Sequence, residues 1–169
     1  SAEHWFGTDQ MGRDLFARVV HGTSESVKAV VVAVLVGLFA GSGIGLLSGY
    51  VGRWLDDVLM RIMDVFLAVP TLLIALAVIN ALGFGTINIA IAVGIGTIAI
   101  FARLMRSEVL KVRSLPYVEA TRFAGISQAR VLARHIIPNA VGPVLVLATL
   151  ELGMAILSDL EAFLFVRAA

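Results

Sequence analysis

Long uncharged segments dominate the hydrophobic pattern of this chain. No residue between Lys28 and Arg53, and none between Asp64 and Arg103, carries a formal charge. About 20 apolar residues, rising ~1.5 Å each, cross the ~30 Å hydrocarbon core of a membrane. The first segment therefore predicts one membrane-spanning helix, over residues 27–50. The second segment has 38 residues, which is too many for one crossing.

A turn signal divides the second segment. Gly83-Phe84-Gly85 lies in its middle, and closely spaced glycines are typical of turns between helices. The segment therefore predicts two spans, over residues 64–82 and 87–104.

A fourth apolar run covers residues 136–157. Glu151 is its one charged interruption, and Pro138 and Pro143 lie near its start, where a helix tolerates proline best. The whole pattern predicts an all-α fold. We expect a polytopic transmembrane bundle with four spans, forming a single domain over residues 1–169.

Composition supports the membrane class. Hydrophobic residues make up 59% of the chain and charged residues 15%, whereas soluble domains have roughly 45–50% and about 25%. The alternative is a soluble protein with hydrophobic core helices, and the 38-residue uncharged stretch argues against it. The net charge of +1 disfavours nucleic acid as a partner. The absence of cysteine excludes disulfides and cysteine-ligated metal sites.

Lysine and arginine concentrate in one predicted loop. Basic residues accumulate on the cytoplasmic side of short loops, so residues 105–135 are predicted to be cytoplasmic and residues 1–26 external. The basic residues of this loop and its borders are Arg103, Arg106, Lys111, Arg113, Arg122, Arg130 and Arg134.

The external segment predicts an interfacial helix from Gly12 to His21, lying on the outer leaflet. Its apolar face is formed by Leu15, Phe16, Val19 and Val20. The segment starts with polar residues and has neither an initiator methionine nor a signal-like apolar core. We therefore expect the chain to begin within a longer protein.

Gly37, Gly41, Gly45 and Gly49 recur every four residues along the first span. This spacing opens a groove in which another helix backbone can approach closely, so it predicts helix packing. Ser42, taken as an intramembrane nucleophile, lacks a base because the histidines lie at or beyond the span ends. No catalytic residue, cofactor-binding residue or metal ligand is predicted.

The basic loop predicts a helix–turn–helix. Pro116 suits a helix start, Tyr117–Ala124 a short amphipathic helix and Gly125 a left-handed stop, while Ser127 suits the cap of a second helix, Gln128–Arg134. A solvated connector is the alternative reading. The small and aromatic residues Ala120, Phe123, Ala124 and Gly125 favour a surface that fits a partner's groove.

The loop resembles the "EAA" cytoplasmic loop of ABC importer permeases, whose pattern is Glu-Ala-Ala, three residues, Gly, nine residues and Ile-x-Leu-Pro. Glu119, Ala120, Gly125 and Pro138 match its spacing, whereas Thr121, His135 and Ile137 depart mildly from it. Two further segments resemble the C-type subunits of the dipeptide, oligopeptide and nickel branch. These are Gly7–Asp14 and the set Tyr50, Gly52, Trp54 and Asp56.

The resemblance implies a type I permease fold and a non-enzymatic subunit of a peptide importer in the bacterial inner membrane. It implies a second, homologous permease, two cytoplasmic ATPase subunits that hydrolyse ATP, and an external solute-binding protein. A full member has a further span before and after this chain, and residues 158–169 depart from the family pattern. The implied ATPase-coupling residues are Glu119, Ala120, Thr121, Phe123, Gly125, Ile126 and Pro138.

The rival function is a secondary transporter or channel subunit that ATP does not drive. Such a protein needs coupling-ion or proton-relay residues within its spans, and Glu151 is the one candidate. Glu151 has two readings: it lines the translocation path, or it is protonated or hydrogen-bonded to a neighbouring helix.

Overall fold

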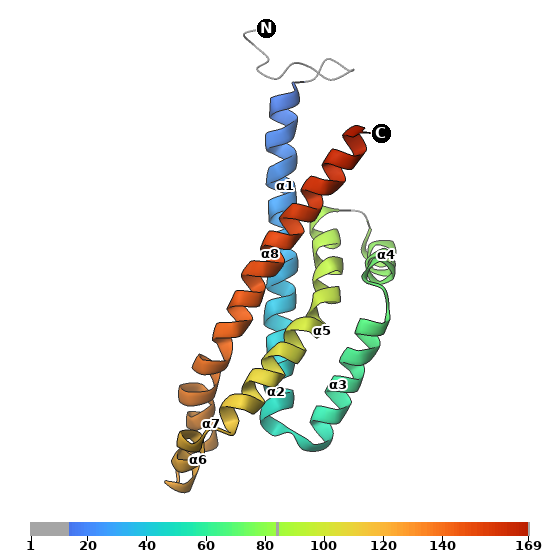
Figure 1. The fold of residues 1–169 in the computed structure, drawn as a ribbon. Coiled ribbons are helices and arrows are strands. Elements are labelled where there is room, and N and C mark those ends of the chain that lie inside the picture. Colours follow the sequence, from blue (N-terminus) through green and yellow to red (C-terminus); the bar gives the residue numbers. More distant parts are fainter. Residues whose placement is uncertain (1–13, 84, 169) are drawn as a thin grey trace.

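The computed structural model describes residues 14–83 and 85–168, and its elements are all helical (Figure 1). The all-α prediction is confirmed. In chain order the elements are α1 (Leu15–Val36), η1 (Gly37–Gly41), α2 (Ser42–Val51), α3 (Arg53–Ala68), α4 (Thr71–Leu82), α5 (Thr86–Arg113), α6 (Pro116–Phe123), α7 (Gln128–Val131), η2 (Leu132–Ile136) and α8 (Ile137–Ala168).

The first long helix is continuous from α1 through α2. The residues flanking the π-helical turn η1, Val36 and Ser42, keep right-handed helical backbone angles, so the turn widens the helix without breaking it. The interfacial helix predicted over 12–21 is not a separate element, because α1 runs from Leu15 directly into the span, and its placement on the outer leaflet stays a prediction. Gly22 keeps a helical conformation, and no proline interrupts this stretch. The part of the prediction that falls on residues 1–13 lies outside the described residues.

The predicted single span over 64–82 is also wrong as one helix. Pro70 has no N–H, and the residue before a proline is driven towards extended angles. Val69 accordingly has φ −89° and ψ 126°, which ends α3 and lets α4 start at Thr71. With 12 residues, α4 is shorter than the ~20 that a crossing needs.

Three stretches within the described residues are long and apolar enough to cross a membrane. They are His21–Val51, Ala90–Arg113 and Gln128–Met154. The second extends beyond the predicted end at residue 104, and the third starts before the predicted start at residue 136. Parts of the predicted loop 105–135 are therefore continuations of the long helices.

Helix α5 lies at the centre of the bundle, beside α1, α2, α4 and α8 (Figure 1). Phe101, Met105 and Val109 are almost completely buried and repeat every four residues, which places them on one face of α5. Ile136, at the end of η2, and Val144, in α8, pack into the same core. This core fixes α5 between the first and last long helices.

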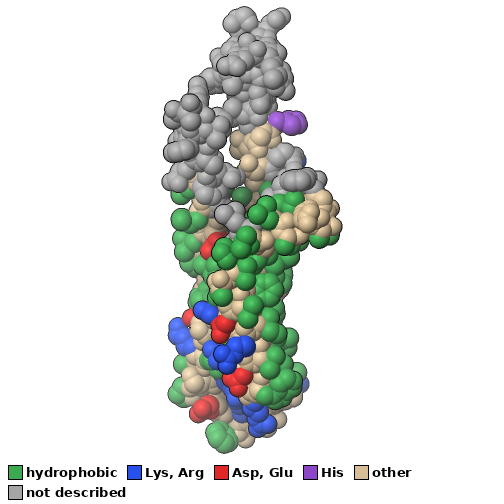
Figure 2. Space-filling view, turned by 90° about the vertical axis from the view of Figure 1, so that its right-hand side faces the viewer, with side chains coloured by type: hydrophobic (Ala, Val, Ile, Leu, Met, Phe, Trp, Pro, Cys, Tyr) green, Lys and Arg blue, Asp and Glu red, His purple; other side chains and the backbone are tan. Residues whose placement is uncertain are grey.

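Among the side chains that the structure describes, charged ones gather at one end of the molecule. Figure 2 shows Lys, Arg, Asp and Glu side chains clustered near that end, below a broad hydrophobic surface. The same end carries the α2–α3 turn and the helices α6 and α7 (Figure 1). This end is called the polar end below.

Candidate functional site

Helix α6, at the polar end, has clear start and stop signals. Leu115 is extended because Pro116 follows it, and Pro116 occupies the first helical turn. Gly125 has φ +75°, its N–H donates to the Arg122 carbonyl, and the Ile126 N–H donates to the Thr121 carbonyl. These two bonds form a Schellman motif, which requires the left-handed conformation that glycine adopts without strain.

One side of α6 is anchored in the core and the other is open. Val118 is completely buried, whereas Glu119 and Ala120 are exposed and Phe123 has 90% of its surface exposed. Burying a phenylalanine side chain against a partner stabilises by about 1.5–3 kcal/mol, so Phe123 offers a partner a favourable contact. The open side of α6 therefore has the character of a contact surface.

The remaining predicted coupling residues fall in three places. Thr121 and Ile126 are half-buried, and the Thr121 hydroxyl donates to the Val118 carbonyl at 2.7 Å. Gly125 is exposed, and a Cβ there would meet no atom within 4 Å. Pro138 lies apart from α6, in the first turn of α8 directly after the π-helical turn η2. A proline has no N–H for the regular helical bond, and a π-helical turn accommodates that loss.

Asp56 and Arg106 join α3 to α5 at the polar end. Arg106 Nε donates to Asp56 Oδ1 at 2.5 Å, and Arg106 Nη2 donates to Oδ2 at 2.6 Å. The hydroxyl of Ser48, which is completely buried in α2, also donates to Asp56 Oδ1. The bonds from Arg106 hold the pKa of the Asp56 carboxyl below its ordinary value, although burial acts in the opposite direction. Three helices therefore meet at one carboxylate.

A tight turn joins α2, which carries Ser48, to α3, which carries Asp56. Gly52 has φ +68°, and Arg53 follows with φ +54°, the one non-glycine residue with positive φ in the described chain. The left-handed conformation costs an ordinary residue roughly 1–2 kcal/mol. The cluster around Asp56 compensates by holding α3 against α2 and α5. Sequence reasoning noted Gly52 and Asp56 as family residues but assigned them no role.

The four spaced glycines of the first long helix face α5. A Cβ at Gly37, Gly41 or Gly45 would overlap atoms of α5, and one at Gly49 would lie 3.0 Å from the Arg106 carbonyl oxygen. Close contact between the two helices therefore depends on the missing side chains. Gly94, which sequence reasoning missed, does the same from α5, where a Cβ would lie 2.7 Å from the Ala33 carbonyl oxygen.

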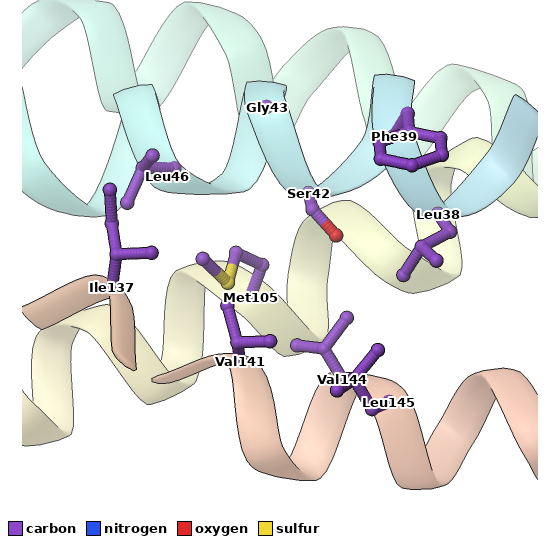
Figure 3. A pocket seen from close by; sticks show the side chains of 10 residues that line it. All are labelled: Leu38, Phe39, Ser42, Gly43, Leu46, Met105, Ile137, Val141, Val144 and Leu145. Atoms are coloured by element: carbon purple, nitrogen blue, oxygen red, sulfur yellow. The ribbon is translucent and has the colours of Figure 1, made fainter. Parts of the chain in front are cut away.

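An apolar groove of about 290 Å³ opens between α2, α5 and α8 (Figure 3). Figure 3 shows Ser42 among apolar side chains such as Phe39, Met105 and Val144. The Ser42 hydroxyl is buried and has no hydrogen-bond partner. No histidine or carboxylate lines the groove, so its chemistry suits an apolar occupant.

Glu151 is half-buried in α8 and does not line this groove. Its carboxylate has no hydrogen bond or ion pair with any residue that the structure describes. The described residues also contain no group of three or more His, Cys, Asp and Glu side chains placed to hold a metal ion.

Residues 41–162 match the family described as "Binding-protein-dependent transport system inner membrane component". The dipeptide transport system permease protein DppC of Alkalihalophilus pseudofirmus is 43% identical over 93% of this chain and 52% of the relative. The glutathione transport system permease protein GsiD of Pectobacterium atrosepticum is 41% identical over 94% of this chain and 52% of the relative. A probable D,D-dipeptide transport system permease protein, DdpC of Escherichia coli, is 42% identical over 93% and 53%.

The chain thus spans about half the length of the curated relatives it matches. Among solved structures, an amino acid ABC transporter matches with a TM-score of 0.61 and 20% identity, over 91% of this chain and 77% of that one. This likeness shows a shared fold.

Proposed function

Because the chain belongs to the family of binding-protein-dependent transport system inner membrane components, we propose that it forms part of the membrane permease of an ATP-driven peptide importer. Within such an importer it provides half of the translocation pathway. The named relatives carry dipeptides, D,D-dipeptides or glutathione. Short peptides are therefore the proposed substrate class.

The observation that carries this proposal is the geometry of α6. Val118 anchors the helix in the core, the Gly125 stop fixes its end, and Phe123 remains 90% exposed. A short, rigidly held helix with an exposed aromatic side chain suits insertion into a partner's groove. We assign that groove to a cytoplasmic ATPase subunit, and α6 is the coupling helix.

The proposed assembly contains a second, homologous permease, two ATPase subunits and an external solute-binding protein. ATP hydrolysis belongs to the ATPase subunits. The polar end faces the cytoplasm, because basic residues favour that side of the membrane. In a bacterium this membrane is the inner one.

Phe123→Ala tests the docking role of α6. The full-length permease is expressed with its partner permease and a tagged ATPase, and the amount of permease that co-purifies is measured. Aromatic anchors carry much of the energy of an interface, so the truncation is expected to reduce co-purification severalfold. Leu150→Ala is the control, because Leu150 is an exposed apolar side chain of α8, a different helix. Equal co-purification of Phe123→Ala, Leu150→Ala and the wild type would contradict the docking role.

A further inference from the structure

Tyr50, near the end of α2, joins two residues that bracket the coupling helix. Its hydroxyl lies 2.9 Å from the backbone carbonyl oxygen of Gln128 and 2.8 Å from that residue's side-chain oxygen. Gln128 begins α7, just after the coupling helix and its turn. The contact spans 78 positions of sequence.

The second connection uses the backbone of Tyr50. Arg113 Nη1 donates to the Tyr50 carbonyl at 3.0 Å and to the Gly49 carbonyl at 3.2 Å. Arg113 is the last residue of α5, and only Ser114 and Leu115 separate it from the coupling helix. The stretch from Arg113 to Gln128, which contains α6, is called the coupling segment. Its first and last residues are thus both bonded to the end of α2.

The chemistry of the Gln128 contact indicates its role. A phenol has one proton, so Tyr50 donates to one of the two oxygens at a time. If the side-chain amide is reversed, its NH₂ group donates to the phenol oxygen while the phenol donates to the backbone carbonyl. Gln128 is exposed, so water can bond to its polar groups when the Tyr50 hydroxyl is removed. The bond therefore holds Gln128 in place beside α2, and it does not serve to satisfy a buried polar group.

We infer that Tyr50 is a positioning residue for transport, holding both ends of the coupling segment on α2 so that a displacement of α6 moves α2 with it. The glycine face of the first long helix then carries the motion to α5, because Gly45 and Gly49 leave no gap between the two backbones. This inference rests on the proposed function of α6. It gives Tyr50, one of the family residues noted in the sequence, a mechanical role.

Tyr50→Phe tests the inference because it removes the hydroxyl and keeps the ring. The full-length permease is reconstituted with its ATPases, partner permease and binding protein in proteoliposomes, and dipeptide uptake and ATP hydrolysis are measured together. Loss of one net hydrogen bond changes an equilibrium about fivefold, so uptake per ATP is expected to fall about fivefold while hydrolysis continues. A purely structural role would reduce the amount of assembled complex and leave this ratio unchanged.

Ser107→Ala is the matched control, because it removes an exposed hydroxyl from α5 that bonds only locally, to the Leu104 carbonyl. Gln128→Ala removes the side-chain partner at an exposed position and keeps the test decisive if Tyr50→Phe does not assemble. It should lower the ratio by less than Tyr50→Phe, since the backbone carbonyl remains, and the double variant should resemble Tyr50→Phe. Unchanged ratios in Tyr50→Phe and Gln128→Ala, with coupled uptake in the wild type, would overturn the positioning role alone. A wild-type complex without ATP-dependent dipeptide uptake would overturn the proposed function as well.

Discussion

Arg106 binds Asp56 through two hydrogen bonds of 2.5 and 2.6 Å, although the two residues are 50 positions apart in the sequence. The side chain of Asp56 is 14% exposed and that of Arg106 is 34% exposed. Removing one partner of a sheltered, bidentate pair leaves a charge without its counterpart, which costs more than the pair itself contributes. The pair therefore ties α3 to α5 at the polar end, which also carries α6.

Asp56→Asn is expected to lower the free energy of unfolding by about 1–3 kcal/mol, because bonds to a charged group are lost and Arg106 stays partly buried. The thermal unfolding midpoint of the purified full-length complex measures the effect. The matched control is Asp64→Asn, which breaks the more exposed ion pair between Asp64 and Arg103. That change should cost at most about 1 kcal/mol. Equal midpoints for the two variants would contradict the special role of Asp56.

Gly45→Ala tests the packing of the first long helix on α5. A Cβ at Gly45 would overlap the Ala102 carbonyl oxygen and lie 2.9 Å from the Arg106 nitrogen, so the helices must separate. Such overpacking costs about 1–3 kcal/mol, and the unfolding midpoint should fall. Gly43→Ala is the control on the same helix, since its Cβ would meet nothing within 4 Å. Alanine forms helices better than glycine by about 1 kcal/mol, so the control should be neutral or stabilising.

Cysteine labelling tests the proposed orientation. Ser24 and Ser114 are both exposed and lie at opposite ends of the long helices. In a full-length protein whose other cysteines are removed, Ser24→Cys should react with a membrane-impermeant thiol reagent in intact cells. Ser114→Cys should react only after the cells are opened. The reverse pattern would invert the topology.

Glu151→Gln separates the two readings of this residue. The change keeps the size and hydrogen-bonding capacity of the side chain but removes the charge. If Glu151 lines the path and meets a cationic group of the solute, uptake of positively charged peptides should fall more than uptake of neutral ones. A structural role predicts equal uptake across peptide charge, with normal assembly. The second result would remove Glu151 from the pathway.

The sequence predicted the features that depend on local backbone chemistry. Gly125 shows this, because a left-handed stop after an amphipathic segment follows from glycine's freedom at positive φ, and the structure has φ +75° there. Pro70 indicates a helix end in an equally local way. The prediction of one span over 64–82 followed the length of the apolar run instead, and so it missed the break between α3 and α4. Hydrophobicity locates apolar segments, whereas proline decides where their helices end.

The long-range contacts of the polar end could not be predicted in the same way. The contact between Tyr50 and Gln128 depends on the packing of α2 beside the end of α5, and no spacing in the sequence encodes it. The family pattern marked Tyr50 and Asp56 as residues of interest. Their partners became clear only from the fold.

The coupling of ATP hydrolysis to transport through α6 is tested most directly by Gly125→Val. Valine has a branched Cβ and strongly disfavours the positive φ that Gly125 adopts. The backbone at the end of α6 must therefore adopt another conformation. Uptake per ATP is measured in proteoliposomes that contain the full-length complex. Gly142→Val is the matched control, because Gly142 is an exposed helical glycine of α8 without positive φ or a close neighbour.

The account predicts that Gly125→Val abolishes most ATP-dependent dipeptide uptake while the complex assembles and hydrolyses ATP, and that Gly142→Val retains the wild-type ratio. Wild-type uptake per ATP in Gly125→Val would contradict the coupling role of α6.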